Sequence, residues 1–93
     1  MVNKNILKIR KQLDRLDDDL LDLIKKRIKL VSLILKNKKF KNEIVDNKRI
    51  SVILRNIKKK SRKKKIDVIV TEKIWKSMIR SFIDYEYRNF NKR

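Results

Sequence analysis

A single long amphipathic pattern constrains the fold of this chain more than any other feature. From about residue 5 to residue 38, aliphatic side chains recur in alternating steps of three and four residues, with one position of the rhythm skipped between Leu23 and Leu30. They are Ile6, Ile9, Leu13, Leu16, Leu20, Leu23, Leu30 and Ile34. This rhythm is typical of a helix that packs lengthwise on another helix. It predicts a helix on the order of 50 Å long, more than a lone small globule can cover, so we expect an oligomer whose long helices cross between subunits.

Two further helices are predicted, giving an all-α fold of three helices in a single domain, residues 1–93. Neither Gly nor Pro occurs, which favours a helical protein with few tight turns. Residues 39–45 are the first expected break, and a helix over about 47–60 follows, with Asp46 as its N-cap. The third helix opens near Asp67, another candidate cap, although residues 68–70 would also suit a short strand. Its apolar face is clear from Trp75 onward.

The composition excludes several classes of site. The absence of Cys rules out disulfides and thiolate metal sites, and the absence of His rules out a histidine base and imidazole ligands. Without Gly there is no glycine-rich phosphate loop, and we expect neither a metal nor a cofactor. Charges at Lys4 and Lys8 interrupt the N-terminus, and apolar runs are only a few residues long. We therefore expect a cytoplasmic protein with no membrane partner.

The net charge of +18 and the run KKKSRKKK, residues 58–65, allow two interpretations. One is a phosphate-binding patch for nucleic acid. The other is a solvated helix end crossing the second connection, since cations favour a helix C-terminus. Few aromatic side chains are present for stacking on bases. We favour the solvated interpretation and keep a basic, non-enzymatic nucleic-acid-binding protein as a less favoured alternative.

Ionisable side chains also lie on or beside the predicted inward faces. Arg27 takes the next step of the first helical pattern after Leu23, and Lys38 ends it. Arg49 lies in the first turn of the second helix, and Glu86 continues the apolar stripe of the third. A buried cation is costly unless an anion pairs with it. Each could alone be a helix-end residue that reaches water, but a small polyanionic ligand between the helices explains the set better.

Over nearly its whole length the sequence resembles the all-helical chorismate mutase family. The segment IRKQLDRLDDDLLDLIKKRIKLVSLILKNK is similar to the family's first helix, with Arg10, Arg27 and Lys38 in matching places. The D-x-x-R of Asp46 to Arg49 and the segment IWKSMIRSFIDYEY are similar to the second and third helices. The resemblance implies an intertwined homodimer with two sites and the rearrangement of chorismate to prephenate, a step of aromatic amino-acid biosynthesis that needs no cofactor.

The resemblance also implies a role for each matching basic residue. Arg10 would reach into the partner subunit's site and bind a carboxylate of the dianionic substrate. Arg27 would be the main carboxylate-binding arginine. Lys38 would contact the ether oxygen and a carboxylate, and Arg49 would order the site.

The remaining matches include two departures from the family pattern. Asp46 would bind a substrate hydroxyl, and Glu86 would hydrogen-bond the ether oxygen, which requires its protonated form. Ile50 stands where the family usually has a hydroxyl-binding Glu, and Phe82 stands where a small residue is common. An aliphatic residue at position 50 is similar to the isochorismate-pyruvate lyase branch, which forms salicylate. That lyase is the main alternative activity, and an inactive or regulatory relative is a further one.

Overall fold

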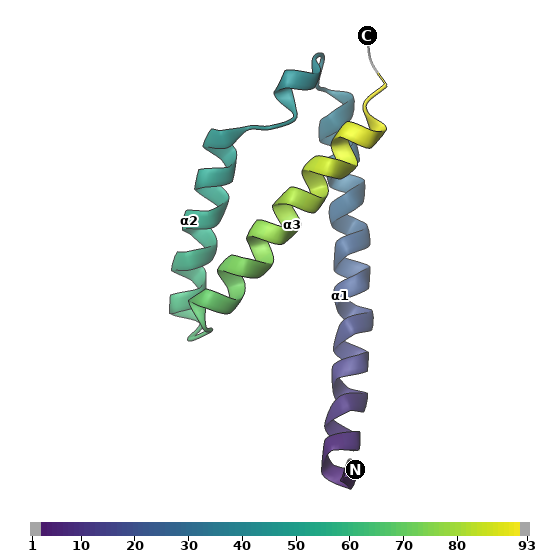
Figure 1. Cartoon of the computed structure of the whole chain (residues 1–93), viewed down its shortest axis with the longest axis vertical. Coiled ribbons are helices and arrows are strands. Elements are labelled where there is room, and N and C mark those ends of the chain that lie inside the picture. The colour runs from purple at the N-terminus through teal and green to yellow at the C-terminus, as the bar shows by residue number, and fades with distance from the viewer. Residues whose placement is uncertain (1–2, 92–93) are drawn as a thin grey trace. The chain divides into compact units, whose positions relative to one another are not determined.

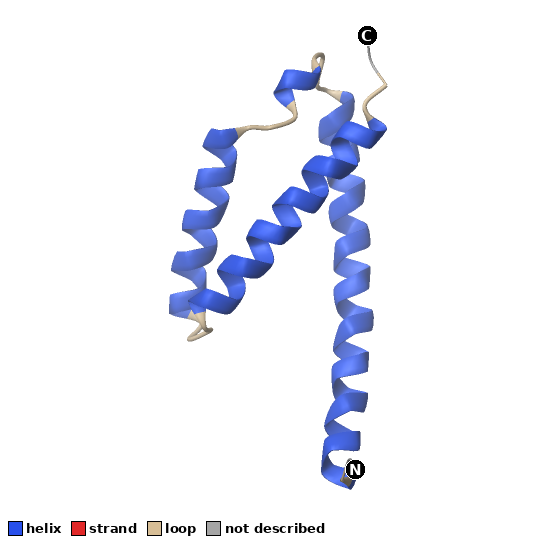
Figure 2. Ribbon diagram, viewed as in Figure 1, coloured by secondary structure: helices blue, strands red, loops and turns tan. Residues whose placement is uncertain are grey.

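The structure is a computed structural model that describes residues 3–91, and its regular elements are helices (Figure 1, Figure 2). They are α1 (Lys4–Lys36), the short 3₁₀ helix η1 (Lys41–Glu43), α2 (Asn47–Lys63) and α3 (Val68–Asn89). No strand occurs within residues 3–91, and residues 68–70 belong to α3. The predicted all-α fold of three helices is confirmed.

The chain forms two compact units, which divide between Val31 and Ser32. The first unit contains most of α1, which begins where the Asn3 Oδ1 atom accepts a hydrogen bond from the Ile6 amide at 2.9 Å. The apolar side chains of its lengthwise pattern are between 40% and 61% exposed. A single amphipathic helix gains little stability without a surface to pack on, so this apolar face needs a cover.

The second unit contains the last turn of α1, η1 and the α2–α3 hairpin. α2 and α3 pack on each other, and half-buried apolar side chains, Ile50 and Leu54 on α2 with Ile79 and Ile83 on α3, line the groove between them. A 2.8 Å hydrogen bond between the hydroxyls of Ser61 and Thr71 joins the two helices near the turn. The hairpin therefore has packing of its own.

Capping residues set where α2 and α3 begin, as the sequence predicted. The Asp46 carboxylate accepts a hydrogen bond from the Arg49 amide at 3.0 Å, and Asp67 accepts one from Ile69 at 2.8 Å. The predicted helix ends were less accurate. α1 ends at Lys36, two residues early, and α2 continues to Lys63, so only the last two residues of the basic run lie in the connection.

The turn after α2 contains a lysine in the left-handed region, with φ of 59° at Lys65. Around it the Ile66 amide donates to the Ser61 carbonyl at 2.9 Å, and the Lys65 amide donates to the Arg62 carbonyl at 3.1 Å. These two bonds form a Schellman motif, whose left-handed position is usually occupied by glycine. Because this chain contains no glycine, a side chain with a Cβ atom bears the steric cost at this position.

Replacing this lysine should therefore stabilise the protein. We expect Lys65→Gly to raise the free energy of unfolding by about 1 kcal/mol, because the relief of left-handed strain exceeds the added chain entropy of glycine. The matched control is Lys64→Gly, which removes the same charge at a residue with φ of −87° and should give no gain. Urea unfolding at one fixed protein concentration measures both variants, and equal stabilities would contradict the strain argument.

Candidate functional site

Two ionisable side chains predicted for the site meet in the second unit. Glu86 lies in the last turn of α3, and Lys38 follows the end of α1 by two residues. The Lys38 Nζ atom lies 2.8 Å from the Glu86 Oε1 atom. Glu86 is buried, with 7% of its surface exposed, and Lys38 is half-buried. A charged pair this well shielded from water interacts more strongly than a surface pair.

The connection after α1 holds Lys38 from a second direction. The Lys38 ammonium also donates to the main-chain carbonyl of Ile44 at 3.4 Å, and Ile44 is buried. The Glu43 carboxylate accepts hydrogen bonds from the amides of Lys39 and Phe40, both at 3.2 Å, and so stabilises the turn that carries the lysine. Sequence reasoning missed both acceptors. Every residue has a main-chain carbonyl, so the sequence does not indicate which one accepts a hydrogen bond from Lys38. Glu43 could have been identified, because it is an acid beside a predicted break.

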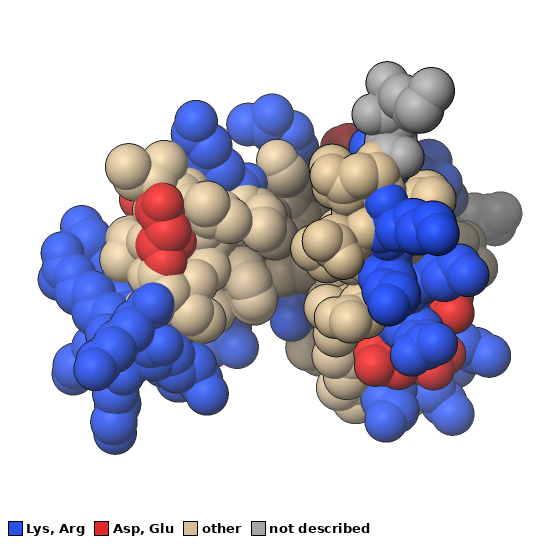
Figure 3. Space-filling model, turned by 90° about the horizontal axis from the view of Figure 1, so that it is seen from below, with Lys and Arg blue, Asp and Glu red and all other residues tan. Residues whose placement is uncertain are grey.

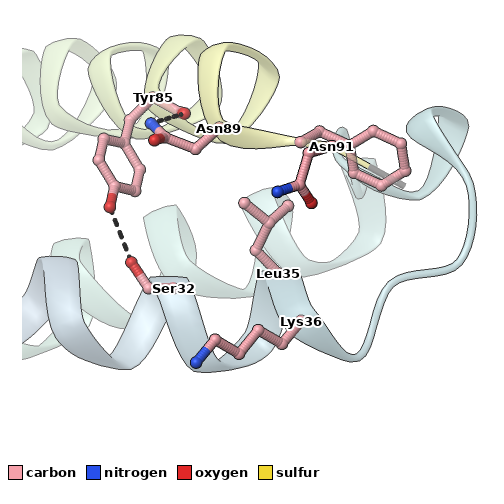
Figure 4. A pocket seen from close by; sticks show the side chains of 7 residues that line it. Ser32, Leu35, Lys36, Tyr85, Asn89 and Asn91 are labelled. Carbon is pink, nitrogen blue, oxygen red and sulfur yellow. Dashed lines mark hydrogen bonds between the residues drawn. The ribbon is translucent and has the colours of Figure 1, made fainter. Parts of the chain in front are cut away.

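A hydroxyl pair joins the same two parts of the chain beside this ion pair. The Ser32 hydroxyl lies 2.8 Å from the Tyr85 hydroxyl, and Tyr85 directly precedes Glu86 (Figure 4). The pair lines a pocket of about 220 Å³. The lining residues are Ser32, Leu35, Lys36, Tyr85, Asn89, Phe90 and Asn91. Since neither Lys38 nor Glu86 lines this pocket, the hydroxyl pair and the ion pair are separate contacts between the α1 end and α3.

An open groove of about 230 Å³ lies between α2 and α3. Its lining residues are Ile50, Leu54, Lys76, Ile79, Arg80 and Ile83. The predicted site residue Ile50 thus belongs to a mainly aliphatic surface, and Phe82 is half-buried beside Ile83. The cations Lys76 and Arg80 were not anticipated. Lys76 pairs with Glu72 at 3.1 Å, and this hydrogen bond lowers the pKa of Glu72.

The other predicted site residues lie at the start of α2 and on α1. Asp46 caps α2, so one of its oxygens is engaged by the Arg49 amide, while the Arg49 side chain is exposed. Arg10 and Arg27 belong to the first unit, where Arg10 is exposed and Arg27 is half-buried. Their approach to the Lys38–Glu86 pair stays a prediction.

Among the described residues no group of three or more acidic side chains is placed to hold a metal ion. None of the helices in residues 3–91 is both long and apolar enough to cross a lipid bilayer.

Comparison with known proteins identifies a family. The sequence model described as chorismate mutase type II matches residues 9–87. This range includes every residue predicted for the site, from Arg10 to Glu86. No curated protein and no solved structure matches the chain.

Proposed function

Because the chain belongs to the type II chorismate mutase family, we propose that it catalyses the rearrangement of chorismate to prephenate. The observation that carries the proposal is the shielded contact between Lys38 and Glu86, at 2.8 Å. It places an ammonium at the end of α3, held there by an acid that lies 48 positions away in the sequence. Such a preorganised cation suits a reaction in which negative charge develops on one oxygen.

The chemistry requires the protein to bind and orient rather than to attack. An intramolecular rearrangement needs no nucleophile, but the dianion must be held in its compact reactive conformer, which is an orientation effect. Arg10 and Arg27 would bind the two carboxylates through charge-assisted hydrogen bonds. The Lys38 ammonium has three N–H groups. Two of them donate to the Glu86 carboxylate and the Ile44 carbonyl. The third would donate to the ether oxygen as the C–O bond breaks.

The geometry supports a positioning role for Glu86. Its carboxylate accepts a hydrogen bond from Lys38 and thereby fixes the direction of the ammonium. Donation from Glu86 itself to the ether oxygen would require a protonated carboxyl group, because an ionised one repels the developing charge. Lys38 is thus the donor that this proposal favours.

A second copy of the chain is part of the proposal. The apolar face of α1 is exposed along most of its length, from Ile6 to Leu23 and again at Leu30 and Ile34, and only two apolar residues of the described chain, Leu35 and Ile44, are buried. A chain of this size normally buries more than half of its surface when it folds. A self-complementary pairing of α1 with the α1 of a second copy would cover the exposed face and bring Arg10 to the partner's site.

One observation favours a second candidate, the isochorismate-pyruvate lyase reaction. Ile50 lies on an aliphatic groove with Leu54, Ile79 and Ile83, and no acid is among the residues that line that groove. A substrate hydroxyl placed there would lose the acceptor that the usual glutamate supplies. A site without this acceptor discriminates less strongly between chorismate and an isomer whose hydroxyl lies elsewhere.

Incubation of the purified protein with each substrate tests the two activities. We expect chorismate to yield prephenate. Isochorismate should yield no salicylate, which is fluorescent and directly measured. Salicylate formation from isochorismate without prephenate formation from chorismate would replace the mutase by the lyase. If neither prephenate nor salicylate forms, the protein has neither the mutase nor the lyase activity.

A further inference from the structure

The segment from Asn47 to Ile66 contains ten Lys or Arg residues and no Asp or Glu. The other two helices contain acids among their cations. In α1 these are Asp14, Asp17, Asp18, Asp19 and Asp22, and in α3 they are Glu72, Asp84 and Glu86. A lysine-rich composition alone would not remove acids from one helix and leave them on its neighbours. The charge of α2 therefore calls for a local explanation.

The cations of α2 are arranged on one face. Lys48, Arg55, Lys59 and Arg62 follow one another at steps of seven, four and three residues, which keeps them in line on a helix. Ile50 and Leu54, which line the groove beside α3, lie on a different side of the helix. We call these four residues the basic stripe. It is about 21 Å long at the rise of an α-helix, and all four side chains are exposed.

Internal charges do not balance the stripe. Lys58, beside the stripe, is attracted by the Glu72 carboxylate, but the ion pairs Lys38–Glu86 and Lys76–Glu72 of the described residues include no residue of the stripe. Cations three or four positions apart on a helix repel one another. The helix dipole favours cations only in the last turn, so it does not account for Lys48 and Arg55. A polyanion bound along the stripe would relieve this repulsion.

The surface shows the same contrast between the helices. In Figure 3 the Lys and Arg side chains gather along the outer edge of the α2–α3 hairpin, at the left, with little acid among them. On α1, at the right, acidic and basic side chains are mixed. The surface of α1 thus has the interspersed charges of an ordinary solvated helix, and that of the hairpin edge does not.

We propose that the basic stripe of α2 binds the phosphate backbone of double-stranded DNA without regard to sequence, as a function additional to the proposed mutase activity. No aromatic side chain occurs in α2, so this helix is not suited to stacking on bases. Lys58 and Lys63 flank it on its two sides. A helix with cations along its crest and both flanks fits the major groove of B-form DNA, where backbones lie on either side.

Fluorescence anisotropy with a labelled duplex of about 20 base pairs, titrated at several salt concentrations, tests this inference. With four to six phosphates neutralised, the slope of log K against log salt should be about −4 to −5. The variant with Lys48, Arg55, Lys59 and Arg62 all changed to Gln should reduce that slope by about 3 to 4 units. Chorismate turnover should be unchanged, since none of these residues belongs to the proposed site.

The matched control changes Lys4, Lys8, Lys25 and Lys29 to Gln, which removes the same charge from exposed positions of α1. It should retain most of the affinity. Equal losses in the two variants would show adsorption driven by net charge and would overturn the inference. So would duplex RNA binding as tightly as DNA, because its major groove does not admit a helix. Binding to anionic vesicles but not to DNA, through the exposed Ile66 and Ile69 at the turn, would equally overturn it.

Discussion

Replacement of Lys38 by alanine is expected to lower kcat for chorismate by about 10²–10³-fold, the usual effect of losing one preorganised donor. The ammonium is held by Glu86 at 2.8 Å and by the Ile44 carbonyl at 3.4 Å, so it is in place before the ether bond begins to break. Because its contact with the ether oxygen strengthens only as charge develops there, kcat and kcat/KM should fall together. Steady-state kinetics of prephenate formation measure both constants.

The same substitution should also destabilise the fold, and this effect must be separated from catalysis. It leaves Glu86, with only 9% of its side chain exposed, without its cation. Breaking a buried pair in this way costs about 3–5 kcal/mol. The double variant Lys38→Ala with Glu86→Gln removes the stranded charge, so it should recover most of the stability while kcat stays low. A double variant that recovers kcat together with stability would show that Lys38 serves the fold alone.

The neighbouring lysine provides the control for Lys38→Ala. Lys39 is exposed, and its contact with Glu43 is made by its main-chain amide. Lys39→Ala therefore removes an equal charge and leaves the turn intact, and both kcat and stability should stay near those of the unchanged protein. A comparable loss in this variant would point to the general positive charge of the connection instead of to one placed ammonium.

The sequence indicated that Lys38 and Glu86 each lie near an inward face, although it assigned them a polyanionic ligand and not each other as partner. Each continues an apolar stripe past its last aliphatic residue, Glu86 within α3 and Lys38 two residues beyond the end of α1. Two opposite charges at such positions are stable only when they find a partner. Local chemistry also located the caps Asp46 and Asp67, because a short acidic side chain just before an apolar helical run can accept hydrogen bonds from the free amides of the first turn.

The contacts that hold this pair in place could not be predicted in the same way. The Ile44 carbonyl acts through the main chain, and the Ser32–Tyr85 bond joins residues that only the tertiary fold brings together. The left-handed Lys65 was also hidden, since glycine is the residue that usually marks such a position. Without Gly or Pro, the helix ends had no strong signal, and α2 extended beyond its predicted end.

Mixing two inactive variants should restore activity if each site is built from two subunits. We expect Arg10→Ala and Arg27→Ala each to lower kcat/KM by at least about 10²-fold, because each removes a charge-assisted bond to a carboxylate. In a mixed dimer, one site would lack both arginines and the other would have both. After subunit exchange at equal amounts, half of the dimers are mixed, so about a quarter of the original activity should return in a two-fold symmetric dimer.

This recovery distinguishes a shared site from two arginines acting within one chain, because in the latter case no mixture contains an intact site. A mixture of Arg27→Ala with Lys38→Ala is the matched control. Both residues are proposed to serve the site of their own subunit, so its activity should stay at the level of the single variants. The mass in solution should be twice the 11.4 kDa of one chain for every variant. If the protein is a dimer but the mixture of Arg10→Ala with Arg27→Ala recovers no activity, the pairing of α1 would stand and Arg10 would lie outside the partner's site. A monomer with full activity would show that no second copy is needed.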